Sequence, residues 1–228
     1  MHSSFFLRLL VFTKKDKPMT DQSRWRRLWH RLKGQSSPDQ IFEQLQAHYT
    51  ELHRAYHNLD HIADCLAQFD QARHLAQQSD ELELALWLHD IIYDTHASDN
   101  EEKSAVWAVE TMATAQIAVE SIKRVESLIL ATKHPAIPAE PEAQLLVDID
   151  LSILGRPPAE FAAYEAKIRR EYAWVSPAAF RQGRRAVLEA FLAREAIYQT
   201  AFFRARFEVQ ARENLRRSVA YLQTEDTD

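Results

Sequence analysis

The chain has little cysteine and little glycine: one cysteine and three glycines among 228 residues. The single cysteine, Cys65, excludes a disulfide within the chain and is typical of a reducing compartment, so we expect a cytoplasmic protein. Three glycines are few for a sheet protein, because tight hairpin turns often require them. The composition therefore disfavours both a disulfide scaffold and a β fold.

The chain also has no long block of basic residues, and its net charge is −5. This balance disfavours broad nucleic-acid binding. The apolar segment at 4–12 is interrupted by Arg8, lacks a basic region before it and is too short to span a bilayer. We therefore expect neither a nucleic acid nor a membrane as partner.

The length and composition are those of one ordinary globular domain, with 46% hydrophobic and 27% charged residues. No repeat or linker divides the chain. We expect a flexible tail over 1–20, one domain over 21–222 and a short tail over 223–228. Met19 is an alternative to Met1 as the true start, and the oligomeric state stays open.

Apolar residues recur at helical spacing almost throughout, and no segment alternates convincingly at period two. A basic segment at 21–33 is amphipathic, and we expect it to pack on the domain. Three further helices are expected to start at residue 38, at residue 79 or 80, and at residue 99, and another is expected to end near residue 150. The remaining helices are expected to cover 58–78, 122–132, 159–174, 177–195 and 196–222. The sequence predicts an all-α architecture of roughly eight to ten helices.

The segment 86–94, LWLHDIIYD, places His89 and Asp90 next to each other inside an apolar run. Burying an unpaired charge costs several kcal/mol. A bound metal cation would supply the missing partner, because imidazole and carboxylate are both good ligands for divalent metals. We therefore looked for further ligands in comparable surroundings.

Two other segments offer them. His57 and His61 are four residues apart, so on a helix they share one face. Asp148 and Asp150 lie in the apolar run 145–152. Surface histidines and solvated acids at a helix end are the alternatives for each pair alone. The order of the three segments in the chain is a stronger signal than any one of them.

That order resembles the HD superfamily of metal-dependent phosphohydrolases, over about 54–152. YHNLDHIAD at 56–64 is similar to a signature of cyclic-nucleotide phosphodiesterases, as is the Asp-Leu-Ser at 150–152. HDIIYDT at 89–95 resembles the motif of stringent-response nucleotide hydrolases, in which an acidic pair follows the His-Asp. Tyr93 replaces the first acid of that pair and Asp94 is retained, and the chain is shorter than a phosphodiesterase catalytic domain and has no identified purine-clamping residues. Neither substrate is therefore carried over.

The resemblance implies an HD-type helical domain that holds one or two divalent ions, with Mn, Fe, Mg, Co, Ni and Zn not distinguished. The implied ligands are His61, His89, Asp90 and Asp150. Asp148 is the rival of Asp150, and His134 falls where some members place a further histidine. His57 matches the histidine that protonates the leaving oxygen, and Asp94 is the second candidate catalytic residue.

Basic residues would hold the phosphate, since phosphoryl transfer depends mainly on positioning and electrostatics. Arg54, Lys133, Arg184 and Arg185 are candidates, with solvated surface charges as the alternative. We expect a hydrolase of a small phosphorylated, nucleotide-like molecule. A di-iron oxygenase, which would need a further ligand such as His134, and a non-catalytic nucleotide-binding protein are the alternatives.

Overall fold

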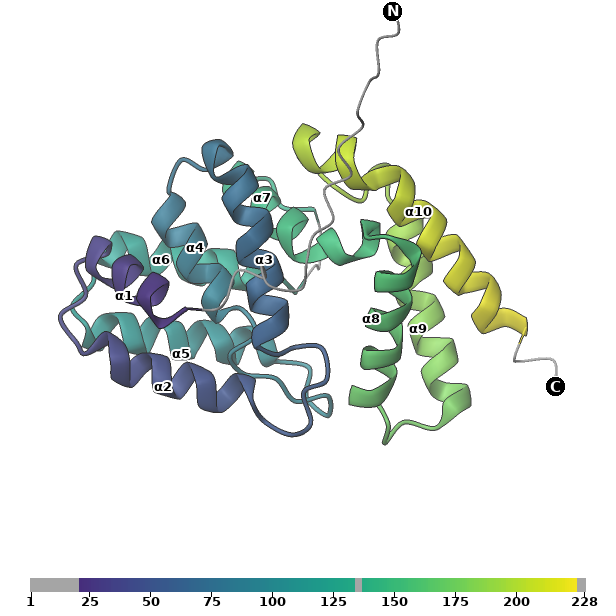
Figure 1. Cartoon of the computed structure of the whole chain (residues 1–228), viewed down its shortest axis with the longest axis horizontal. Helices are drawn as coiled ribbons and strands as arrows, with labels where there is room; N and C mark the ends of the chain where they lie inside the picture. Colours follow the sequence, from purple (N-terminus) through teal and green to yellow (C-terminus); the bar gives the residue numbers. More distant parts are fainter. Residues whose placement is uncertain (1–20, 134–136, 225–228) are drawn as a thin grey trace, which may run out of the picture.

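The computed structural model describes residues 21–133 and 137–224, in which every regular element is a helix (Figure 1). The α-helices are α1 (Gln22–Arg31), α2 (Pro38–Tyr49), α3 (Leu59–Ala72), α4 (Ser79–Leu88), α5 (Asn100–Thr114), α6 (Val119–Ala131), α7 (Pro141–Asp150), α8 (Pro158–Glu171), α9 (Pro177–Leu192) and α10 (Ala201–Thr224). Two 3₁₀ helices, η1 (Arg73–Leu75) and η2 (Leu151–Gly155), follow α3 and α7. The all-α class and the expected number of helices are thus confirmed.

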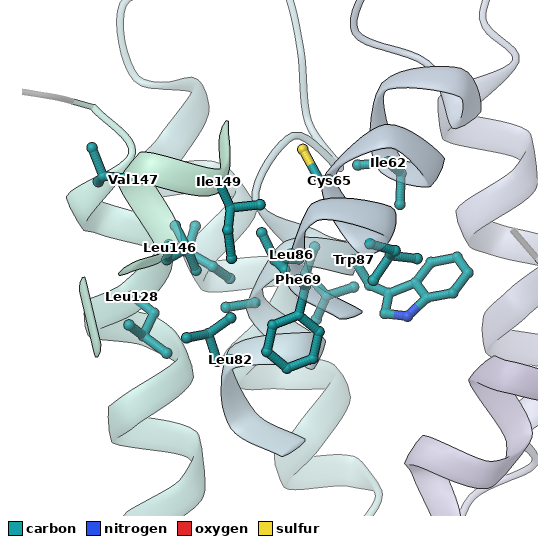
Figure 2. Close-up of a cluster of buried hydrophobic side chains, with 14 of the residues drawn as sticks. Ile62, Cys65, Phe69, Leu82, Leu86, Trp87, Leu128, Leu146, Val147 and Ile149 are labelled. Carbon is teal, nitrogen blue, oxygen red and sulfur yellow. The ribbon is translucent and has the colours of Figure 1, made fainter. Parts of the chain in front are cut away.

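Helix α4 is the centre of the fold. It contacts α1, α3, α5, α6 and α7, and its residues from Glu81 to Leu88 are all buried. A helix that is apolar on nearly all sides must be enclosed by other elements. Figure 2 shows the resulting core between α3, α4, α6 and α7, which includes Ile62, Cys65, Phe69, Leu82, Leu86, Trp87, Leu128, Leu146 and Ile149.

The basic segment near the N-terminus packs on α4 as helix α1, as the sequence predicts. Trp25 and Trp29 are fully buried and stack on each other at 5.2 Å between ring centroids. Trp25 also meets Trp87 of α4 edge-on. On the polar side of α1, Arg24 forms a 2.7 Å ion pair with the buried carboxylate of Glu83, so both faces of α1 are used.

Helices α8, α9 and α10 form a separate group beside the helices that surround α4 (Figure 1). The group is joined to α7 through η2, which contacts both α8 and α10. Gly155 at the end of η2 lies so close to α10 that an added Cβ would come within 2.7 Å of the Phe207 carbonyl oxygen. Only glycine permits this approach without displacing the backbone.

Some element boundaries differ from the expectation. Helix α3 ends at Ala72, and α4 begins after Gln78 with no side-chain cap, so Ser79 and Asp80 lie inside the first turn. Helix α10 begins at residue 201 and extends to 224, two residues into the expected tail. Residues 1–20 and 225–228 lie outside the described ranges. Among the described residues, 21–133 and 137–224, no helix has the length and apolar character needed to cross a bilayer.

Candidate metal centre

Three helix ends bring the polar residues of the apolar segments together. His61 lies in the first turn of α3, which Asn58 caps by accepting a hydrogen bond from the Asp60 N–H. His89 is the C-cap of α4, and Asp90 follows it in the turn. Asp150 is the last residue of α7. Both histidines are almost completely buried.

The four side chains face a common point. His61 Nε2 lies 3.2 Å from His89 Nε2, 3.4 Å from an Asp90 carboxylate oxygen and 3.2 Å from an Asp150 carboxylate oxygen. His89 Nε2 lies 3.2 Å from the same Asp90 oxygen and 3.6 Å from the same Asp150 oxygen. Each of the two carboxylates therefore lies within 3.6 Å of both Nε2 atoms, and His61, His89 and Asp90 form one group of potential metal ligands.

These separations suit a metal ion. Ligand atoms about 2.1 Å from a tetrahedral ion lie about 3.4 Å from one another, which is close to the distances above. The tautomer of His89 also fits, because its Nδ1 lies 3.0 Å from the Leu86 carbonyl oxygen. A carbonyl only accepts, so Nδ1 carries a proton, and in the neutral ring that would bind a metal the Nε2 lone pair faces the cluster. The residues present thus fit a divalent cation.

The electrostatics of the cluster call for a cation. Burial disfavours a positive charge on either ring, yet the surrounding acidic groups outweigh it and hold the pKa values of His61 and His89 well above their usual range. Burial would raise the pKa of Asp90, but the adjacent His89 lowers it well below its usual range. Two carboxylates and two inward-facing nitrogens therefore concentrate negative potential at one point.

Cys65 lies beside this cluster, but its Sγ is about equally distant from both ring nitrogens of His61. It is buried one helical turn after His61 and forms a second group of potential ligands with His61 and Asp150. Its Sγ lies 3.7 Å from Nδ1 and 3.8 Å from Nε2 of His61. A co-ligand of the ion bound at Nε2 would lie much nearer to Nε2 than to Nδ1. We therefore leave Cys65 out of the ligand set.

His57 lies next to the cluster and is held by a carboxylate. The His57 and His61 ring centroids are 6.0 Å apart, and His57 stacks on Tyr93 at 4.1 Å. His57 Nδ1 lies 2.7 Å from Oε2 of Glu171, at the end of α8. The Tyr93 hydroxyl donates to the same oxygen at 2.8 Å. This arrangement fixes the ring plane and leaves Nε2 of His57 available for chemistry.

Glu171 is the site residue that sequence reasoning missed. Its side chain is buried, and its Oε1 accepts three consecutive backbone N–H groups, from Ala55, Tyr56 and His57. Burial works against its ionisation, but the hydrogen bonds from His57 and this backbone lower the pKa of Glu171 to about 2. Its partner His57 is 114 residues away in the sequence, so no local pattern could reveal the pair.

Arg54 forms hydrogen bonds with the backbone around the cluster. Its buried guanidinium donates to the carbonyl oxygens of His57, Asp90 and Ile91 at 2.6–3.1 Å. It also pairs with Glu51 at 2.9 Å. These bonds occupy the donors of Arg54 and orient the loops that carry the candidate site. The contacts therefore favour a positioning role over the phosphate-binding role considered from the sequence.

Within the described residues, the remaining candidates form bonds with residues other than His61, His89, Asp90 and Asp150. Lys133 bonds to Glu102 and to the Ser98 carbonyl oxygen. The largely buried Arg184 pairs with Glu165 and donates to the Tyr164 hydroxyl. The exposed carboxylate of Asp94 bonds to the N–H and ring of His96, and not to a cluster residue. Arg185 pairs weakly with Glu189. His134 lies outside the described residues.

The structure gives Asp148 and Asp150 different partners. Asp148 is fully buried and accepts from the N–H of Gln199, the N–H of Thr200 and the Thr200 hydroxyl at 2.6–2.8 Å. The Thr200 hydroxyl in turn accepts from the Phe203 N–H in the first turn of α10, so Asp148 holds the residue that caps that helix. Asp150 alone of the two faces the histidines. The sequence preference for Asp150 as ligand agrees with this arrangement.

We expect Asp150→Asn to weaken metal binding by at least about tenfold, because even outer-shell partners of a ligand have effects of that size. Asp148→Asn should keep the metal but lower the melting temperature, since an amide nitrogen would face the N–H donors of the α10 start. Metal titration and thermal unfolding of both variants measure the two effects. The reverse ranking for metal affinity would contradict this assignment.

A cavity elsewhere in the molecule is separate from the four cluster residues. It has a volume of about 560 Å³, lies between α8, α9 and α10, and is lined by none of those residues.

Compared with known proteins, the chain matches no family model, no curated protein and no solved structure at a significant level. The candidate function therefore depends on the residues and geometry described above.

Proposed function

We propose that the protein is a metal-dependent phosphohydrolase of the HD type, which cleaves a small phosphate ester or nucleotide. The observation that carries the proposal is the position of His57. It lies beside four convergent metal-ligand side chains, and a buried carboxylate holds one of its ring nitrogens. A cluster that only stabilised the fold would not need an oriented proton donor next to it.

The ligands supply the first half of the chemistry. A divalent ion held by His61, His89, Asp90 and Asp150 would acidify a water and polarise a phosphoryl oxygen. The carboxylates of Asp90 and Asp150 are 18% and 17% exposed, whereas the two imidazoles are almost closed to solvent. The carboxylate side is thus the side from which a substrate can approach.

The pair of His57 and Glu171 supplies the second half. The low pKa of Glu171 keeps its carboxylate ionised, so Oε2 accepts the proton on Nδ1 of His57. This bond fixes the plane of the His57 ring, so that an Nε2–H points away from Glu171. A departing alkoxide oxygen near Nε2 would take that proton as the P–O bond breaks.

Metal analysis followed by a phosphoester panel tests the proposal. The purified protein should contain a divalent ion and hydrolyse at least one phosphomonoester or phosphodiester, and Asp90→Ala should lose both properties. Asp60→Asn, which alters an exposed carboxylate on α3, is the matched control. Full metal content and normal melting in Asp90→Ala would contradict the metal site.

The same assays distinguish the alternatives. Tight nucleotide binding without turnover, with every metal tried, would favour a non-catalytic binding protein. Iron content together with oxygen uptake would favour an oxygenase on the same scaffold.

A further inference from the structure

Trp174 is an exposed tryptophan held in a fixed orientation. It lies in the turn between α8 and α9, and 54% of its surface is exposed. Its indole N–H donates to the Thr95 hydroxyl at 2.8 Å. The ring of His96 stacks on it, with centroids 4.1 Å apart and planes 18° from parallel. Such an aromatic surface gains free energy when another flat group covers it.

The stacked pair is built from the same segments as the proposed proton donor. Trp174 follows Glu171 by three residues, and the Thr95 hydroxyl also donates to the Glu171 carbonyl oxygen at 3.5 Å. Glu171 in turn binds His57. A continuous series of contacts therefore joins the exposed indole to the histidine beside the metal-ligand cluster.

Asp94 completes the arrangement. One of its carboxylate oxygens accepts from the backbone N–H of His96 at 2.9 Å and contacts His96 Nδ1 at 3.1 Å. These bonds set the plane of the imidazole that lies against Trp174. His96 thus covers one face of the indole, and 54% of the Trp174 surface is still exposed.

We propose that Trp174, backed by His96, is a stacking platform for the base of a nucleotide substrate, so that the enzyme selects nucleotides over phosphate esters without an aromatic group. The inference rests on the proposed function for the phosphate end of that substrate. A base stacked on an aromatic side chain gains affinity without base-specific hydrogen bonds. The platform therefore selects for an aromatic base and not for one particular base.

Rapid-mixing binding measurements on the metal-loaded, full-length protein, completed before turnover, test the platform. The probes are adenosine 5′-monophosphate and ribose 5-phosphate, which differ only in the base. The wild type should bind the nucleotide about tenfold more tightly, and Trp174→Ala should remove that preference without changing affinity for ribose 5-phosphate. Trp174→Phe should retain part of the preference because it keeps a ring.

Tyr221→Ala, which removes another exposed aromatic side chain on α10, should bind both probes as the wild type does. Equal affinity of the wild type for the two probes would overturn the platform. So would an equal loss of affinity for the two probes in each of the variants Trp174→Ala and Trp174→Phe. Phosphoester turnover in the presence of metal is measured separately. The platform proposal can therefore be contradicted while hydrolysis is confirmed. If instead the platform is confirmed and no phosphoester is hydrolysed, the protein has a nucleotide-binding surface without hydrolase activity.

Discussion

Replacing His57 by alanine should lower the hydrolysis of an alkyl or nucleoside phosphate ester by about 10²–10⁴-fold, the usual contribution of a general acid. His57 is not among the four residues that converge on the cation site, so the variant should keep its metal. An alkoxide is a poor leaving group, and its departure needs the proton that the His57 ring is placed to give.

The size of the loss should depend on the leaving group. A nitrophenolate is already stable as an anion, so His57→Ala should lose much less activity on a nitrophenyl ester. His53→Ala is the matched control, because His53 also stacks on Tyr93 but does not contact Glu171. Equal losses on both esters with the metal retained would mean that His57 shapes the site or binds phosphate.

Glu171→Gln should have the second large effect. The carboxylate accepts five hydrogen bonds, three from the backbone of 55–57 and two from the His57 ring and the Tyr93 hydroxyl. A glutamine amide turns one of the two acceptor oxygens into a donor, which would face donors. Activity on a poor leaving group should fall by about 10²–10⁴-fold, as for His57→Ala, because the imidazole loses its orienting partner.

The stability effect of Glu171→Gln should depend on pH. The pKa of Glu171 is about 2 in the folded protein and is lowered from an ordinary value of 4.5. A lowered carboxyl pKa stabilises the fold fully above pH 4.5, and this contribution is lost as the pH falls from 4.5 toward 2. The shift corresponds to about 3 kcal/mol of unfolding free energy.

Urea unfolding at pH 7 and pH 3 measures the contribution of the Glu171 carboxylate to the unfolding free energy. The difference in unfolding free energy between wild type and Glu171→Gln should be large at pH 7 and clearly smaller at pH 3. Glu160→Gln, an exposed position in the first turn of α8, should show little difference at either pH. A difference of the same size at both pH values would show that the Glu171 carboxylate is not selectively ionised by the fold.

The residues of the candidate cluster could be identified from the sequence because each stands out locally. His89, Asp90 and Asp150 interrupt apolar runs, and a polar group buried in such a run needs a partner. The helical periodicity that predicts the fold is local in the same sense, since it compares residues only three or four positions apart. Both signals could therefore be read without knowing which helices pack together.

Other roles could not be read in this way. The sequence predicts Arg54 as a phosphate-binding residue and Asp94 as a catalytic one, but it does not reveal that Arg54 binds loop carbonyl groups or that Asp94 binds His96. Asp148 and Asp150 have almost the same local sequence, yet Asp148 binds Thr200 just before α10 and Asp150 faces His61. Which face of α7 meets which neighbour depends on the packing of α10 and α3, which the local pattern does not encode.

By itself, the sequence determined the all-helical class, the approximate helix boundaries and the candidate residues His61, His89, Asp90 and Asp150, because period and polarity are properties of neighbouring residues. Only the tertiary structure decided that Glu171 holds His57 and that Trp174 lies against His96, from positions 114 and 78 residues apart. Such partners become close only when α8 packs beside the loops that follow α2 and α4. Their charges and rings carry no local signal of that packing.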